Sequence, residues 1–114
     1  MYQSKPTRLK VPITIAFATH TTVASATLVP INGILKQIAV KCPAMTAGVN
    51  TVLTILDDDG DTLYTSGNNA SAATTVTTSL ATALVGKHTL TLTAAGAQDA
   101  DKACVVKLYV ATNL

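Results

Sequence analysis

The sequence has no glutamate and no tryptophan, and it is poor in charge and in aromatic rings. Only 12% of its 114 residues are charged, about half of the usual share in globular proteins. Without glutamate and with few long side chains, it lacks the residues that usually occupy solvent-facing helix positions. With one phenylalanine and three tyrosines, it also lacks the aromatic platforms on which sugars and single-stranded nucleic acids stack.

Further absences exclude several partners. The formal net charge is only +2, and no run of basic residues with interleaved aromatics predicts a nucleic-acid partner. No segment is long and apolar enough to predict a membrane partner. The short apolar segment at residues 13–18 is interrupted by Thr14 and does not resemble a secretion signal, so we expect synthesis in the cytoplasm.

The chain also lacks the residue groups of a zinc site or a catalytic site. Cys42 and Cys104 are too few for a structural zinc site, and His20 and His88 are not at ligand spacing from them. We expect the cysteines to be buried free thiols, with a disulfide between them as the alternative. No G-x-S-x-G elbow and no glycine-rich phosphate loop is present. We therefore predict no enzyme activity, no catalytic residue and no cofactor.

Threonine and alanine dominate instead, and threonine suits a pleated sheet because its branched Cβ is stiff. The mean hydropathy of +0.39 has two interpretations. Either partners cover much of the surface, or alanine and threonine raise the index without forming apolar patches.

Apolar and polar residues alternate in most of the chain, which predicts strands over residues 13–18, 21–29, 34–42, 51–56, 62–65, 87–95 and 103–111. The pair Asn32-Gly33 is interpreted as a turn, and Ile34 and Leu63 are expected to face the core. Lys36 does not fit the alternation. Residues 66–82 are small and polar, which predicts a long loop or a weak edge strand, with a short helix over 79–84 as an option.

Seven or eight short strands separated by turns predict an all-β fold, an antiparallel β-sandwich of jelly-roll or immunoglobulin-like type. Residues 13–114 are assigned to one sandwich domain. Residues 1–12 are polar, basic and contain two prolines, so they are interpreted as an extended arm or a disordered tail.

The strongest local signal is the acidic stretch at residues 57–61. Asp59-Gly60 between two β-rich segments predicts a hairpin turn. Three carboxylates at alternate positions, those of Asp57, Asp59 and Asp61, also suggest a calcium site, although the EF-hand order is not met. Because aspartate is a favoured turn residue, a turn without metal is the simpler interpretation.

The order of motifs resembles small structural proteins of tailed bacteriophages over about residues 13–110. The residues that carry it are GILKQIAV at 33–40, TVLTILD at 51–57, DG at 59–60, TLY at 62–64, LVG at 84–86, LTL at 90–92 and VVKLYV at 105–110. The resemblance implies a β-sandwich that decorates or cements a capsid, or that sits in the neck or tail. It also implies a trimer whose arm engages neighbours, which makes Lys5, Arg8 and Lys10 candidate partner contacts.

The resulting hypothesis is a virion protein, a capsid decoration (cement) protein that binds and stabilises the lattice of the major capsid protein and is made in the host cytoplasm. The alternative is a tail, neck or head-fibre adhesive module that binds a host-surface ligand. Its only candidate site is the loop at residues 57–61 together with Tyr64.

Overall fold

The computed structural model describes residues 8–28 and 30–112, which form nine β-strands and one short 3-10 turn. The strands are β1 (Arg8–Phe17), β2 (Val23–Leu28), β3 (Gly33–Lys41), β4 (Thr51–Leu56), β5 (Thr62–Asn69), β6 (Thr74–Thr77), β7 (Thr82–Leu84), β8 (His88–Ala94) and β9 (Lys102–Ala111), with the turn η1 (Thr46–Gly48) between β3 and β4. In this part of the chain, no helix is long and apolar enough to span a bilayer.

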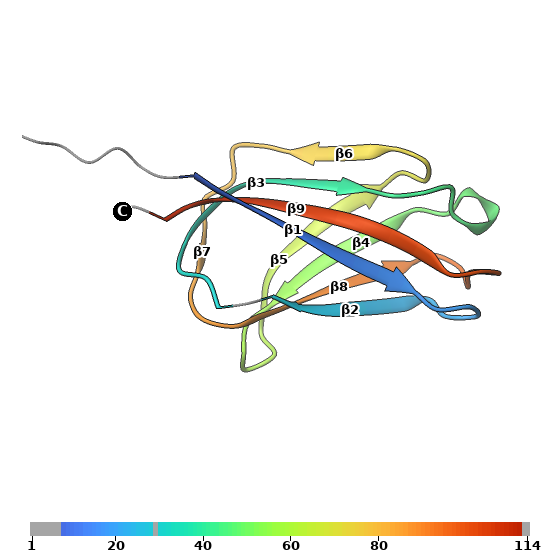
Figure 1. Cartoon of the computed structure of the whole chain (residues 1–114), viewed down its shortest axis with the longest axis horizontal. Coiled ribbons are helices and arrows are strands. Elements are labelled where there is room, and N and C mark those ends of the chain that lie inside the picture. Colours follow the sequence, from blue (N-terminus) through green and yellow to red (C-terminus); the bar gives the residue numbers. More distant parts are fainter. Residues whose placement is uncertain (1–7, 29, 113–114) are drawn as a thin grey trace, which may run out of the picture.

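The strands form two antiparallel sheets that pack against each other (Figure 1). Sheet A has the order β1-β9-β3-β6, and β7 also pairs with β3. Sheet B has the order β2-β8-β4-β5. The predicted antiparallel β-sandwich is confirmed. The strand count is nine rather than seven or eight, because residues 66–82, expected to be a loop or weak edge strand, contain β6 and the first residue of β7. The optional helix over 79–84 is absent, and β7 occupies its second half.

The core lies between the sheets and is built by the predicted alternation. Every second residue of β8 and β9 is buried, and the same holds for β4. The fully buried side chains of these and neighbouring strands include Ile15, Phe17, Leu35, Leu53, Ile55, Leu90, Leu92, Cys104, Val106, Leu108 and Val110. Burial of this apolar surface is the main term that stabilises the sandwich.

The N-terminal boundary differs from the expectation. Strand β1 begins at Arg8, so residues 8–12 belong to sheet A, where they pair with the end of β9. The expected start at residue 13 is therefore five residues late. Residues 1–7, including the candidate contact Lys5, lie outside the described residues.

A bulge in β3 explains why Lys36 does not fit the alternation. Leu35 pairs with Val110 and Gln37 pairs with Tyr109, so Lys36 is the extra residue. The Lys36 carbonyl accepts a hydrogen bond from the backbone N–H of Leu80. The bulge reverses the inward and outward positions, so Leu35 is in the core and Ile34 is only half-buried. The assignment of Ile34 to the core face is wrong for this reason.

Strand β5 also differs from the prediction. Leu56 pairs with Thr62, and Ile55 pairs with Tyr64. Leu63 is therefore an extra residue of β5 that has no partner in β4. Leu63 is consequently exposed, contrary to the prediction, while Tyr64 packs against the core. The strand continues to Asn69 because polar side chains replace ladder bonds: the Ser66 hydroxyl accepts from the backbone N–H of Leu53 at 2.8 Å.

Candidate functional site

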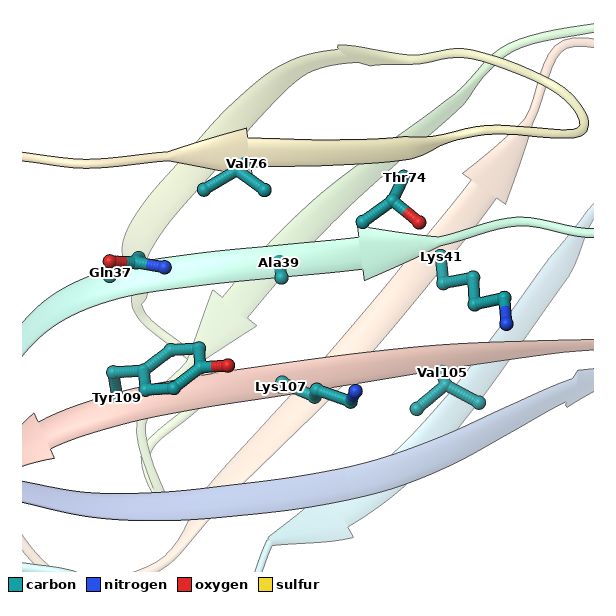
Figure 2. A pocket seen from close by; sticks show the side chains of 8 residues that line it. All are labelled: Gln37, Ala39, Lys41, Thr74, Val76, Val105, Lys107 and Tyr109. Atoms are coloured by element: carbon teal, nitrogen blue, oxygen red, sulfur yellow. The ribbon is translucent and has the colours of Figure 1, made fainter.

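A hollow of about 240 Å³ lies on the outer face of sheet A (Figure 2). Strands β3, β6 and β9 supply its lining side chains, which are Gln37, Ala39, Lys41, Thr74, Val76, Val105, Lys107 and Tyr109. Figure 2 shows Gln37 and Tyr109 at one end, and Lys41 with Val105 at the other. We call this surface the lysine face.

Strand register explains how the hollow forms. Three rows of cross-strand neighbours cover the face: Lys10, Tyr109 and Gln37; Pro12, Lys107, Ala39 and Val76; and Thr14, Val105, Lys41 and Thr74. Ala39 occupies the middle of the central row, and its side chain ends at Cβ. The floor is therefore lower than the surrounding longer side chains. Val76, on the short edge strand β6, is 52% exposed at the rim.

The lysine face carries positive charge without internal compensation. Neither the Lys41 nor the Lys107 side chain has a hydrogen bond or an ion pair with any of the described residues. Lys10 lies opposite Tyr109 and therefore on the same face. The structure thus places one of the three arm residues singled out in the sequence on the same face as two lysines that were not predicted as contacts. Arg8 is also in β1, opposite Ala111.

The aspartate side chains of the described residues lie in two loops, and three of them accept hydrogen bonds. Thr46 donates its hydroxyl hydrogen to Asp99 Oδ1 at 2.7 Å, which lowers the pKa of that carboxyl. Thr19 donates both its backbone N–H and its hydroxyl to Asp101 Oδ1, each at 3.0 Å. The remaining aspartates are in the hairpin between β4 and β5. No carboxylate therefore lies on the described part of the lysine face.

The acidic hairpin has the geometry of a turn. Asp57 Oδ1 accepts hydrogen bonds from the backbone N–H groups of Asp59 at 3.0 Å and Asp61 at 2.8 Å. Gly60 has φ of +85°, which only glycine adopts without strain. Carboxylate oxygens of Asp57, Asp59 and Asp61 lie within 4.8 Å of one another, close enough to face one cation. The hydrogen bonds account for the cluster without a metal, and the calcium site stays a hypothesis.

Replacing Asp57 by alanine should lower the free energy of unfolding by about 1–2 kcal/mol, because two backbone N–H groups lose a charged acceptor. Asp58→Ala is the matched control, since Asp58 is exposed and makes no hydrogen bond with the described residues. We expect it to change stability by less than about 0.5 kcal/mol. Urea unfolding measures both variants.

We expect calcium to leave the melting temperature of the unmodified protein unchanged, because Asp57 Oδ1 is already bound to the backbone. A ligand that binds only the folded state raises the melting temperature, so a calcium-dependent rise would instead show a metal site. If Asp57→Ala and Asp58→Ala lowered the free energy of unfolding equally, the turn interpretation would be contradicted.

The histidines lie apart from any such cluster. His88 is buried in β8, and neither ring nitrogen has a hydrogen-bond partner within the described chain. His20 is exposed in the loop after β1, with φ of +67°, and its backbone N–H donates to the Gln98 carbonyl at 2.7 Å. His88 is thus a packed strand residue.

Sequence reasoning missed Gln98, which is completely buried at one end of the sandwich. Its Oε1 accepts from the backbone N–H of Thr46 at 2.9 Å, and its Nε2 donates to the Gly96 carbonyl at 2.9 Å. Its backbone also bonds to the loop after β1 through His20 and Thr21. Gln98 therefore joins three loops, and nothing in its local sequence indicated this.

No protein-family model and no curated protein sequence matches the chain. Among solved structures, a chain of the cyanophage Pam1 capsid asymmetric unit is similar at 20% identity and a TM-score of 0.59, covering 97% of this chain and 89% of that one. The carbohydrate-binding module CBM36 in complex with calcium and xylotriose has 18% identity and a TM-score of 0.45, covering 90% and 98%. The structure of infectious bursal disease virus Gx strain has 11% identity and a TM-score of 0.41, covering 95% and 33%.

The cyanophage chain shares its fold with this protein. Because the similarity covers nearly all of both chains, the two are close in length and match as whole chains.

Proposed function

We propose that this chain is a structural protein of a bacteriophage virion, and specifically a decoration protein that binds and stabilises the capsid lattice. The observation that supports this is the shared fold with a chain of the cyanophage capsid, over nearly the whole of both chains. Under this proposal, the protein is located in the virion.

The lysine face is the surface we assign to capsid docking. Its lysines have no carboxylate partner in the described residues, so an acidic surface on the capsid protein would complement them. The hollow above Ala39 can receive an apolar side chain from the partner, flanked by the Tyr109 hydroxyl and the Gln37 amide. Modest affinity at each site suffices, because contacts repeat over the lattice.

The outer face of sheet B is suited to contact between copies of the chain. Its cross-strand rows hold uncharged residues: Val23, Thr93, Val52 and Asn68; Ser25, Thr91, Thr54 and Thr65; and Thr27, Thr89, Leu56 and Thr62. Such a surface can be buried without stranding a charge. A homotrimer formed through this face leaves the lysine face of every copy free for the capsid.

The proposal is tested by adding purified protein to particles of the parent phage that lack it. We expect the protein to sediment with the particles, to saturate at a fixed number of copies, and to raise the temperature at which the particles open. Equilibrium sedimentation of the free protein should give the mass of three copies. Electron microscopy then locates the bound protein.

The adhesive alternative predicts a different result. Protein that failed to bind particle shells but bound host cells would support an adhesive module. Failure to bind either would contradict both functions.

A further inference from the structure

The two cysteines lie side by side in sheet A although they are far apart in sequence. Cys42 directly follows β3, and Cys104 is near the start of β9. Their exposed fractions are 3% and 0%, and both belong to the core between the sheets. Both are free thiols in this structure.

Strand register places them opposite each other. The last paired residues of β3 and β9 are Lys41 and Val105, and the preceding pair is Val40 and Val106. Because the strands are antiparallel, the next step of the same register pairs Cys42 with Cys104. Facing residues share one side of the sheet, so both side chains point into the core, as their burial shows.

The hydrogen-bond pattern shows whether Cys42 and Cys104 form a hydrogen-bonded or a non-hydrogen-bonded pair of the antiparallel strands. The Cys42 backbone N–H donates to the Ala73 carbonyl at 2.9 Å, on the β6 side of β3. In an antiparallel strand, the N–H and C=O of one residue point to the same neighbour. Toward β9, Cys42 is therefore in a non-hydrogen-bonded pair, with a typical Cα separation of about 4.5 Å. Disulfides span Cα separations of about 4.4–6.8 Å.

The thiols also interact chemically. A hydrogen bond from the Cys104 thiol lowers the pKa of Cys42 to about 6, against the opposing effect of burial. The Thr51 hydroxyl, 3.5 Å from Cys42 Sγ, acts in the same direction. The same interaction and burial raise the pKa of Cys104. The Thr51 hydroxyl beside Cys42 favours the thiolate of that residue, and the thiolate is the reactive form.

We propose that Cys42 and Cys104 form a cross-strand disulfide when the protein meets a two-electron thiol oxidant. With the azo compound diamide, the Cys42 thiolate adds to one nitrogen of the N=N bond, and that nitrogen's partner takes a proton. The Cys104 sulfur then attacks Cys42 Sγ, the S–N bond breaks, and the released nitrogen takes the second proton. Two thiols become one disulfide, and diamide is reduced to the hydrazine.

This bond would join β3 to β9, two neighbouring strands inside sheet A. It would close a long loop, because Cys42 and Cys104 are far apart in the sequence. Closing a long loop restricts the unfolded chain and so stabilises the folded one. The inference does not depend on the proposed function, although a virion outside the cell meets an oxidising environment.

The test is oxidation of the folded protein with diamide. We expect intact mass to fall by two hydrogen atoms, and peptide mapping to link Cys42 to Cys104 within one chain. We also expect the melting temperature to rise on the order of 10 °C, reversibly on reduction. Cys42→Ala is the control and should show neither change.

Three outcomes would overturn the proposal. The first is that both thiols still react with a thiol reagent after oxidation and denaturation. The second is that the link forms only between chains. The third is that oxidation succeeds only in denaturant and lowers the melting temperature, which would show that the folded strands hold the sulfurs in an unsuitable geometry. Circular dichroism of Cys42→Ala verifies that the control is folded.

Discussion

Gly33→Ala should destabilise the protein by about 3 kcal/mol, at the upper end of the usual range for overpacking. A Cβ at this position would lie 2.5 Å from the Ala111 carbonyl oxygen and 2.8 Å from Val110 Cγ1. The carbonyl is main chain of β9 and cannot rotate away, so β3 and β9 would have to separate. Native proteins have free energies of unfolding of only about 5–15 kcal/mol, so this loss would be a large fraction of the total stability.

Gly67→Ala is the matched control, because an added Cβ there meets nothing within 4 Å and φ is not positive. We expect a change of less than about 0.5 kcal/mol. Urea unfolding followed by circular dichroism measures both variants. If Gly33→Ala were as stable as Gly67→Ala, the close approach of β3 to β9 would not be present in solution.

Reversing two charges on the lysine face should abolish most of the attachment to particles. In the double variant Lys41→Glu and Lys107→Glu, two carboxylates would face the acidic capsid surface that we propose. Like charges brought together at an interface are strongly repulsive, so we expect apparent affinity to fall by about tenfold or more. Neither lysine has an ion pair with the described residues, so the melting temperature should barely change.

Two further variants separate a specific surface from an effect of net charge. Lys87→Glu, in the exposed turn before β8, makes the same change in net charge as Lys41→Glu or Lys107→Glu alone, but away from the face. It should therefore retain more attachment than either of these single variants. Ala39→Leu fills the hollow without a change in charge and should weaken attachment. Co-sedimentation at two salt concentrations measures the double variant, the two single reversals, Lys87→Glu and Ala39→Leu, since screening weakens charge contacts. Equal weakening by Lys87→Glu would falsify the assignment of this face.

The strands with strict alternation were predictable from sequence. In β8 and β9 the buried residues are those of the two-residue period, as in β4, because each strand faces the core on one side only. A one-residue slip in register would expose the whole apolar set. This local constraint is sufficient to identify the sandwich.

The errors arise where a partner strand determines the outcome. Leu63 looks like an inward residue, but a bulge opposite Ile55 turns it outward. Gly33 was interpreted as part of a turn with Asn32, yet it is a strand residue without positive φ, and the reason for glycine is the backbone of β9. Such contacts are between residues far apart in the sequence.

The lysine face was only partly predictable. The two-residue alternation puts Lys41 and Lys107 at outward positions of their strands, but no sequence rule places those strands next to each other. That placement follows from β9 lying between β1 and β3. The signal that was available is the confinement of all six acidic residues to two short segments, which leaves the other surfaces uncompensated.

Gln98 joins three loops at one end of the sandwich. The two ends should therefore differ in how well they tolerate an inserted peptide. At the Gln98 end, an inserted peptide would have to break side-chain and backbone hydrogen bonds that join segments from three parts of the chain. The acidic hairpin at residues 57–61 is bonded within itself and is mostly exposed. A foreign epitope or enzyme tag would therefore be displayed from that hairpin tip, with the Gln98 end left intact as the anchor of the scaffold.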